Sequence, residues 1–381
     1  MANVVLDDVN QVTAEEINRK VQYKMDQLNK DWTNLPKEHN LTKFSASLKE
    51  IIEKAGHNEM YGVELVAPVT DEKPAPHTTL IILQKFLRAN VDDLEKAKEQ
   101  LTSALKWRKE YQPLKVRDEV YDKDKFGGLG FVTKVKGASE TKNEEDVVSW
   151  NIYGAAAKDV KKTFGDTDAF VRWRVALQEI TIQQLKLNEA TEIVPDYGKG
   201  PDPYKAINVH DYLSVSFFRR PQEIKDSSSK IIDMFQRYYP ETVSYKYFVN
   251  VPLVMQWMMG AMKALMSKDS IQTMTWMTYG SELHKYLGIE VPKEYGGSGA
   301  PLAEHALTPN YGAGSVAAPV DTKVAEPVAP AEPVPATAAE PVPATAAEPV
   351  EPKVAEPVPT VNGGVTTAEV TGKLADKADV A

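Results

Sequence analysis

The last 69 residues of this 381-residue chain contain no aromatic side chain, and they limit how much of the chain can fold. The tetrapeptide Ala-Glu-Pro-Val occurs five times between residues 325 and 358, and the segment holds 11 of the 25 prolines. Proline at this density interrupts helices and the ladders of sheets, and the small side chains offer little apolar surface to bury. We therefore predict a disordered tail over residues 313–381, partly in the polyproline II conformation, and a fold confined to the first 312 residues.

The charge balance excludes one large class of binding protein. The whole chain carries a formal charge of −9, of which −6 belongs to the tail and only −3 to the first 312 residues. A nucleic-acid-binding domain normally shows a strong basic excess, so we expect no nucleic-acid partner. A nearly neutral folded part still allows a local basic rim that contacts membranes peripherally.

Further absences in the sequence restrict its chemistry and its location. The chain has no cysteine, which excludes disulfides, thiolate metal sites and cysteine nucleophiles. Its most apolar stretch, residues 251–266, is interrupted by Gln256 and Lys263 and is shorter than the about 20 apolar residues that span a membrane. The first residues lack the basic and apolar regions of a secretory signal, so we expect a cytoplasmic protein.

Hydrophobic periodicity divides the first 312 residues into parts. It predicts a helical N-terminal region over residues 1–77, and two helices over residues 78–112 that are separated at Asn90 and resumed at Asp92 or Asp93. Residues 113–301 alternate strands with helices, which is typical of a mostly parallel sheet covered by helices. The expected strands are residues 130–136, 147–153, 204–218, 247–251 and 273–277. The expected helices are residues 155–164, 169–187, 221–239, 254–266 and 281–287.

Standard catalytic and nucleotide-binding motifs are missing from the sequence. It contains no Gly-x-x-x-x-Gly-Lys-Ser/Thr, Gly-x-Gly-x-x-Gly, His-Glu-x-x-His or Gly-x-Ser-x-Gly segment. The six histidines are scattered along the chain, and only His210 lies in a strongly apolar predicted strand. We therefore expect a binding protein rather than an enzyme.

The predicted strand that contains His210 is the most informative segment. Alternation with a period of two places His210 and Tyr212 on one face and Asp211 on the other. The residues alone leave two interpretations open. Both side chains can be core residues whose polar ends find backbone partners. Alternatively, the Tyr212 phenolate, a hard anionic donor, can ligate ferric haem with His210 as its neighbour.

A second group of motifs follows in order along the chain. Tyr239-Pro-Glu241 ends a predicted helix, Asn250-Val-Pro252 ends a predicted strand, and Tyr295-Gly-Gly297 marks a later turn. Between the last two lie seven of the 11 methionines, whose flexible side chains suit either a surface that moves across a pocket or a core helix. Together with the helix pair that begins at Leu83-Gln-Lys-Phe-Leu-Arg-Ala89, this ordered set resembles the CRAL-TRIO lipid-binding family over residues 78–300.

More narrowly, four segments resemble the fungal non-classical phosphatidylinositol-transfer subgroup, which is known for binding haem. They are Trp150-Asn-Ile-Tyr-Gly154, Val171-Arg-Trp-Arg174, Val209-His-Asp-Tyr212 and Tyr245-Lys-Tyr-Phe-Val-Asn-Val-Pro252. The resemblance implies an α/β fold in which a helical lead-in precedes a mixed, mostly parallel sheet. This sheet would floor an apolar pocket closed by a gating helix near residues 254–266. It also implies a protein that exchanges phosphatidylinositol between membranes, binds haem b, and is linked to phosphoinositide homeostasis or the response to oxidants.

The same resemblance assigns roles to individual residues. It makes Tyr212 the axial ligand of the haem iron and His210 its neighbour, with Tyr153 as a further pocket contact. Arg174 and Lys246 would supply positive charge to the phenolate or to the haem propionates.

Three other positions concern the family's ligand contacts. Glu241 matches the acid on the inositol side of the lipid. Gln272-Thr273 stands where other members often place a lysine for the inositol phosphate. Asn90 stands where the subgroup can offer a tyrosine to the haem pocket. These two departures weaken the expected lysine and tyrosine contacts.

Two other functions remain open beside lipid exchange. A haem-dependent redox enzyme would use tyrosine ligation as catalase does, and a haem or lipid sensor would pass its state to a partner without net lipid transport. An enzyme needs an open distal position with a placed acid or base, for which His210 is the one candidate. For the carrier we expect peripheral association with endoplasmic reticulum or microsomal membranes.

Overall fold

The computed structural model describes residue 32 and residues 35–69, 75–141, 143–215, 221–253, 255 and 272–312. These residues belong to one compact unit. The gating helix expected over residues 254–266, apart from Met255, and the tail over residues 313–381 lie outside the described residues.

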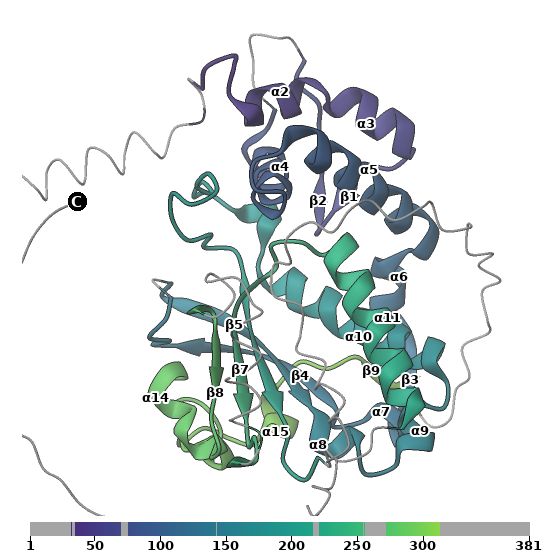
Figure 1. The fold of residues 1–381 in the computed structure, drawn as a ribbon, viewed down its shortest axis with the longest axis vertical. Helices are drawn as coiled ribbons and strands as arrows, with labels where there is room; N and C mark the ends of the chain where they lie inside the picture. The colour runs from purple at the N-terminus through teal and green to yellow at the C-terminus, as the bar shows by residue number, and fades with distance from the viewer. Residues whose placement is uncertain are drawn as a thin grey trace, which may run out of the picture. The chain divides into compact units, whose positions relative to one another are not determined.

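A five-stranded sheet forms the centre of the described structure (Figure 1). Its strands lie in the order β4 (Gly130–Lys136), β5 (Glu145–Ile152), β6 (Ala206–Asp211), β7 (Val243–Val249) and β8 (Met274–Trp276). β4 and β5 pair antiparallel, and each later strand pairs parallel with the strand before it. The prediction of a mixed, mostly parallel sheet is therefore confirmed.

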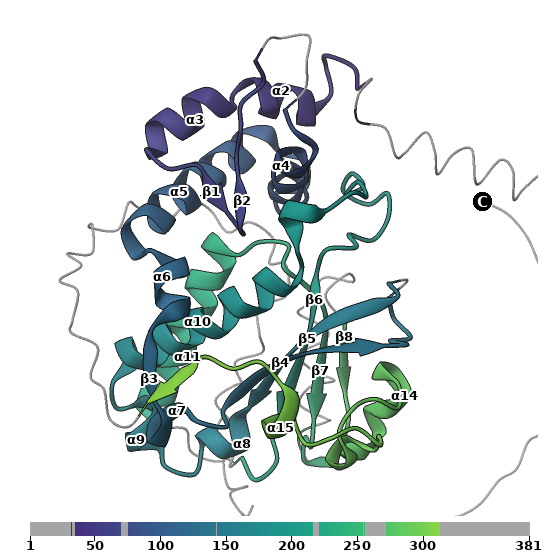
Figure 2. The same ribbon diagram turned by 180° about the vertical axis from the view of Figure 1, so that it is seen from behind.

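Two long helices cover one face of this sheet. They are α10 (Thr167–Gln184), which connects β5 to β6, and α11 (Gln222–Tyr238), which connects β6 to β7. Successive parallel strands are joined by right-handed crossovers, so both helices lie on the same face, and they lie side by side in Figures 1 and 2. No helix among the described residues is both long enough and apolar enough to cross a membrane.

The opposite face of the sheet is covered by the last part of the described chain. Trp150, Val209 and Tyr247 on this face pack against Leu287, Tyr295 and Leu302. The covering elements are η3 (Gly280–Glu282), α14 (His284–Leu287), η4 (Lys293–Tyr295) and α15 (Leu302–His305). The other short elements are α6 (Pro113–Asp118), β3 (Val120–Asp122), α7 (Lys123–Phe126), α8 (Tyr153–Ala156), α9 (Val160–Phe164), η2 (Leu187–Glu189) and β9 (Asn310–Gly312).

A helical lobe precedes the sheet in the chain. It contains α2 (Asn40–Ala46), α3 (Leu48–Ala55), the hairpin of β1 (Glu59–Met60) and β2 (Val63–Glu64), α4 (His77–Ala89) and α5 (Leu94–Tyr111). The predicted break between two helices is confirmed, because α4 ends at Ala89 with Asn90 as its C-cap, and the Asp93 carboxylate caps α5 by accepting the Lys96 amide hydrogen. The sequence does not predict the hairpin, because strands of two residues carry no periodic pattern.

Several predicted elements were wrong in their bounds. The helix expected over residues 281–287 is the 3-10 helix η3 (Gly280–Glu282) followed by the separate short helix α14 (His284–Leu287). Within the described part of the strand expected over residues 204–218, which ends at residue 215, β6 spans only Ala206–Asp211, because the Asp211 carboxylate accepts the Leu213 amide hydrogen at 2.8 Å and turns the chain. The helix expected over residues 155–164 is two short helices, since Asp159 caps the second one. The strand expected from Tyr247 already begins at Val243.

Candidate ligand-binding site

Five side chains form what we call the aromatic cluster: Tyr153, His210, Tyr212, Phe248 and Trp276. The His210 ring stacks on Tyr153 and on Phe248, with ring centroids 5.5 and 4.9 Å apart. The Tyr212 ring lies 5.2 Å from Tyr153 and 6.3 Å from Phe248, and Trp276 lies 5.4 Å from Phe248. The predicted common face of His210 and Tyr212 is therefore confirmed, although Tyr212 follows the strand instead of lying within it.

The register of the sheet explains why these rings meet. His210 of β6 lies opposite Phe248 of β7, which lies opposite Trp276 of β8, so three rings stand in one row across the strands. The neighbouring row toward the amino ends of the strands contains Ser149, Asn208 and Lys246. The face of the sheet below α10 and α11 is therefore aromatic in one row and polar in the next.

A hydrogen-bond network on the opposite face holds the turn that carries Tyr212. Asp211 accepts one hydrogen bond from Asn250 Nδ2 at 2.7 Å and another from the Tyr295 hydroxyl at 2.8 Å. Asn250, in the left-handed region with a φ of 58°, accepts the Gly280 amide hydrogen at 2.8 Å through its Oδ1. Asn250 of the Asn-Val-Pro motif and Tyr295 of the Tyr-Gly-Gly motif thus both bind Asp211, the residue immediately before Tyr212.

The chemistry of the aromatic cluster fits haem. Phenolate and imidazole are both haem-iron ligands, and stacked rings offer a flat apolar wall to a planar macrocycle. His210 is fully buried, and its Nδ1 lies 3.2 Å from the Tyr153 hydroxyl, so the imidazole is held beside the tyrosines. Asn90 instead makes local contacts, since its Nδ2 donates to the Phe86 carbonyl at 2.9 Å and to Gln100 Oε1 at 2.7 Å.

Arg174 lies on α10, one of the helices above this face. Its side chain is buried, its guanidinium lies over the Phe235 ring at 5.1 Å, and its Nη1 makes no hydrogen bond to a described residue. Buried guanidinium groups are normally paired with an anion, so Arg174 is suited to an anionic group on a ligand. The structure brings Tyr153, His210 and Tyr212 together and places Lys246 one row away.

A second group of functional side chains lies at the amino ends of β6 and β7. We call it the ionic cluster: Lys85, Arg88, Asp202, Lys205 and Glu241. The Glu241 carboxylate accepts hydrogen bonds from Arg88 Nε at 3.3 Å and pairs with Lys205 Nζ at 2.5 Å. Lys85 and Asp202 form a fully buried ion pair with 2.5 Å between Nζ and Oδ2, and Lys85 also donates to the Glu241 carbonyl at 3.0 Å.

Burial and ion pairing oppose each other in the Lys85–Asp202 pair. Burial lowers the pKa of Lys85, against the attraction of Asp202. For Asp202, burial alone raises the pKa, but the positive charges of Lys85 and Lys205 outweigh it and hold the pKa below its usual value. The sequence singles out only Glu241 in this cluster. Of the other four residues, only Lys85 could have been noticed in the sequence, because it stands beside the apolar stripe of α4.

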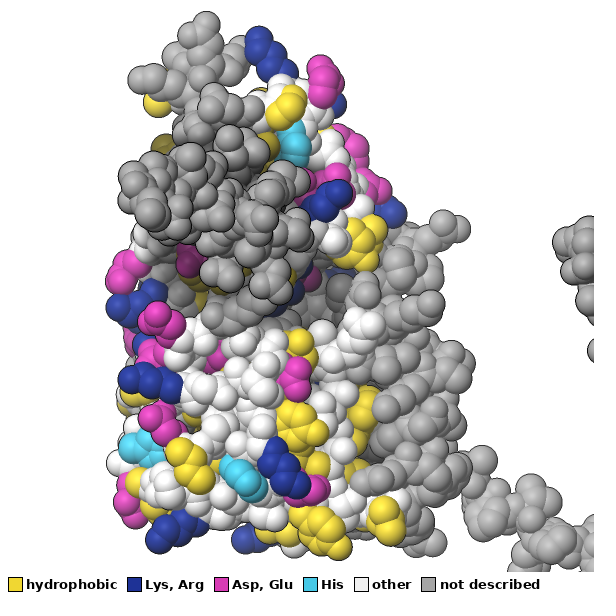
Figure 3. Space-filling view, turned by 90° about the vertical axis from the view of Figure 1, so that its left-hand side faces the viewer, with side chains coloured by type: hydrophobic (Ala, Val, Ile, Leu, Met, Phe, Trp, Pro, Cys, Tyr) yellow, Lys and Arg dark blue, Asp and Glu magenta, His cyan; other side chains and the backbone are white. Residues whose placement is uncertain are grey.

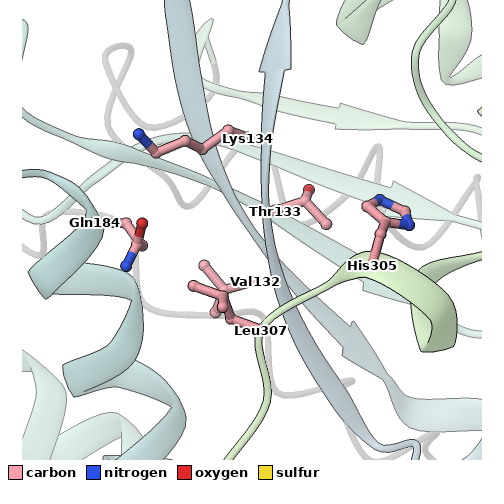
Figure 4. A pocket seen from close by; sticks show the side chains of 6 residues that line it. All are labelled: Val132, Thr133, Lys134, Gln184, His305 and Leu307. Carbon is pink, nitrogen blue, oxygen red and sulfur yellow. The ribbon is translucent and has the colours of Figure 1, made fainter.

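A separate hollow of about 190 Å³ lies at the edge of β4 (Figure 4). Its lining side chains come from β4, from the end of α10 and from the segment around α15: Val132, Thr133, Lys134, Gln184, His305 and Leu307. Thr133 already accepts a hydrogen bond from the Trp150 indole, and Lys134 pairs with Glu145. The hollow shares no residue with the aromatic or ionic cluster, and we assign no ligand to it.

Comparison with known proteins identifies close relatives. The phosphatidylinositol transfer protein SFH5 of Phaeosphaeria nodorum is 49% identical over 267 residues, which are 70% of this chain and 78% of that protein. The phosphatidylinositol transfer protein sfh5 of Sclerotinia sclerotiorum is 48% identical over 280 residues, which are 72% of this chain and 65% of that protein.

Comparison of structures finds a relative of the same name as the comparison of sequences does. A solved structure described as the crystal structure of Sfh5 matches with a TM-score of 0.58 and 28% sequence identity, and the match covers 72% of this chain and 93% of that one. The profile of the CRAL/TRIO domain matches residues 143–297, which contain the aromatic cluster and Glu241. The chain therefore belongs to the CRAL/TRIO family.

Proposed function

We propose that this chain binds phosphatidylinositol and exchanges it between membranes, and that its pocket also binds haem b through Tyr212. The two fungal relatives that are 49% and 48% identical are named phosphatidylinositol transfer proteins. These names describe carriers rather than enzymes, which agrees with the prediction that the chain is not an enzyme.

The ionic cluster supports the lipid part of the proposal. The Glu241 carboxylate can accept hydrogen bonds from inositol hydroxyls, while Arg88 and Lys205 carry the positive charge that a lipid phosphate requires. Lys205 offers a cation in a chain that has Gln272-Thr273 where other members often have a lysine. The side chains of Arg88, Lys205 and Glu241 are between 11% and 14% exposed, so charge interactions there are weakly screened.

The aromatic cluster is the observation that supports the haem part. Tyr212 provides an anionic oxygen ligand, His210 and Tyr153 stand beside it, and Lys246 and Arg174 provide positive charge for two propionates. Haem bound there would supply a ferric ion and its redox chemistry. One aromatic row beside one polar row on this face of the sheet suits a planar ligand with carboxylate arms.

Lipid exchange in such a pocket requires no bond to be broken. About 30 methylenes of a phospholipid, at roughly 0.8 kcal/mol each, are shielded from water while the pocket is closed. Opening of such a pocket therefore loses this burial unless it happens against a membrane, where the lost burial is replaced.

Exposed apolar side chains support peripheral contact with membranes. Leu213, Leu253 and Tyr279 follow the carboxyl ends of β6, β7 and β8, and they are 61%, 71% and 68% exposed. On the face shown in Figure 3, basic and acidic side chains are interspersed, and several hydrophobic side chains gather toward its lower end. Partial insertion of such side chains can hold a nearly neutral protein at a membrane such as that of the endoplasmic reticulum.

The haem part is tested by absorption spectroscopy and iron analysis of the protein purified from cells supplied with haem. We expect a visible spectrum and iron in the sample. A colourless, iron-free protein contradicts haem binding and leaves lipid exchange as the function. Haem without transfer of phosphatidylinositol between vesicles favours the sensor instead.

Replacing Glu241 by Gln is expected to slow phosphatidylinositol transfer about tenfold or more, because hydrogen bonds to a charged group are stronger than those to a neutral amide. The measurement is the movement of labelled phosphatidylinositol between vesicles. Glu95→Gln, which alters an exposed ion pair on α5, serves as the control and keeps the wild-type rate. Equal rates for Glu241→Gln and the wild type contradict the role of the ionic cluster in headgroup binding.

A further inference from the structure

The hairpin of β1 and β2, outside the matched CRAL/TRIO domain, has an unusual turn. Met60 pairs with Val63, and the two residues between them, Tyr61 and Gly62, have φ values of 58° and 81°. Two-residue turns with both φ values positive normally place Asn, Asp or Gly first, because larger side chains are strained there. An aromatic residue in this conformation indicates that its side chain makes a contact that offsets the strain.

The contact of Tyr61 is with the Tyr239-Pro-Glu241 segment. Tyr61 is 1% exposed, and its hydroxyl donates a hydrogen bond to the Pro240 carbonyl at 3.1 Å. Its ring stacks on the Tyr239 ring with centroids 6.1 Å apart. Burial raises the pKa of the Tyr61 hydroxyl well above its usual value, so it remains a neutral donor. The tip of the hairpin thus holds the peptide group immediately before Glu241.

Charged side chains at the base of the hairpin form a hydrogen-bond network that reaches the same segment. The Glu59 carboxylate accepts two hydrogen bonds from the Arg108 guanidinium, at 2.8 and 2.9 Å, and one from the Gly62 amide at 2.8 Å. Arg108 also donates to Glu179 at 2.8 Å, and Glu179 accepts the Tyr239 hydroxyl at 2.6 Å. Tyr239 is thus held by the Arg108–Glu179 pair, and Pro240 is held by Tyr61.

Glu241 itself needs this support. Its φ of 55° is uncommon for a residue with a side chain, and this conformation directs its carbonyl to Lys85 and its carboxylate to Lys205 and Arg88. A residue keeps such a conformation only where its surroundings hold it firmly. The hairpin supplies that constraint from the N-terminal side of the segment.

We propose that the β1–β2 hairpin is a positioning element of the headgroup site, in which Tyr61 holds Glu241 in the orientation that meets an inositol phosphate headgroup. This inference rests on the proposed function. It extends the headgroup site into the N-terminal lobe, so that a residue outside the lipid-binding domain influences affinity for the lipid.

The first test uses the full-length protein without ligand and measures hydrogen exchange of two bonded amides. The Tyr239 amide donates to the Phe235 carbonyl, and the Ala206 amide donates to the Thr242 carbonyl, so both report on the segment. In Tyr61→Phe, which keeps the ring and removes the hydroxyl, we expect both amides to exchange about fivefold faster. Tyr61→Asn suits the turn better but loses the contact, so it is expected to accelerate exchange as well. Tyr245→Phe, on the other face of the sheet, is the control.

The second test measures transfer of phosphatidylinositol between vesicles and the haem absorption spectrum. We expect Tyr61→Phe to slow transfer in the same direction as Glu241→Gln, and to leave the haem spectrum unchanged, because Tyr212 lies at the other end of β6. Unchanged exchange in both Tyr61 variants overturns the positioning role, whatever the lipid result. Faster exchange with normal transfer, while Glu241→Gln slows transfer, also overturns it. A wild-type protein that moves no phosphatidylinositol refutes the proposed function, and with it the headgroup role of the hairpin.

Discussion

Replacing Tyr212 by Phe is expected to abolish the visible charge-transfer absorption of the haem-loaded protein and to weaken haem binding about tenfold or more. The phenyl ring keeps the stacking contacts with Tyr153 and Phe248, so the change removes little beyond the oxygen that we propose as the iron ligand. The measurement is a haem titration followed by absorption spectroscopy of wild type and variant.

Tyr153→Phe is the matched control for the Tyr212 experiment. It removes a hydroxyl that lies 3.2 Å from His210 Nδ1, in the same cluster. We expect a small spectral shift and nearly unchanged affinity for haem, since the proposed iron ligand, Tyr212, is retained. If the spectrum of Tyr212→Phe equals that of the wild type, Tyr212 is a core residue and the haem ligand lies elsewhere.

Replacing Lys85 by Met is expected to lower the free energy of unfolding by about 3–5 kcal/mol, since it leaves the buried Asp202 carboxylate without its ion-pair partner. Asp202 would keep its place with no cation 2.5 Å away, and the carbonyls of Tyr204 and Glu241 would each lose a donor. The measurement is urea unfolding of wild type and variant. A lower midpoint with an unchanged dependence on urea concentration reports the loss of stability.

Two further variants separate the charge effect from simple loss of packing. Lys85→Met combined with Asp202→Asn removes both charges and should recover part of the lost stability. Lys96→Met breaks an exposed pair with Asp93 and is expected to change stability by less than about 0.5 kcal/mol. A loss in Lys85→Met no larger than in Lys96→Met contradicts the structural importance of the buried pair.

Acid is expected to destabilise the protein partly through Asp202. Its pKa in the folded protein lies below the ordinary value of 3.8, because the attraction of Lys85 and Lys205 outweighs the effect of burial. The stabilisation by the carboxylate is therefore complete above that ordinary value, and it is lost as the pH falls through the lower, folded pKa. Unfolding measured between about pH 5 and pH 2 should show a shallower decline in Asp202→Asn than in the wild type.

Several elements of the fold follow from local patterns in the sequence. An aspartate at residue 92 or 93 is recognisable as a helix cap because aspartate is favoured at that position, and the structure assigns the cap to Asp93. β4 is recognisable because β-branched and aromatic residues fill four of its seven positions. The predicted strand over residues 204–218 is too long because the apolar pattern does not mark where the strand ends. Apolar residues continue beyond Asp211, whereas the strand ends where the Asp211 carboxylate turns the backbone at Leu213.

The two clusters show the same division between local pattern and tertiary contact. His210 and Tyr212 could be placed on one face, because side-chain alternation is a property of consecutive residues. Lys205, five residues before His210 in a less patterned loop, gives no sign of its partner, because Glu241 is brought to it only by the pairing of β6 with β7. Tyr61 and Pro240 lie 179 residues apart, and no local pattern relates them.

The prediction that the fold is confined to the first 312 residues rests on the sequence alone, since a proline-rich tail without aromatic residues offers little apolar surface to bury. The sequence by itself determined the family, the type of sheet and the face that carries His210 and Tyr212, because composition, ordered motifs and periodicity are local properties. Only the tertiary structure decided which charges neutralise one another, how the aromatic rings stack across strands, and that the N-terminal hairpin reaches the segment holding Glu241. Those features depend on distances between residues far apart in the chain, and these distances are set by packing the whole core together.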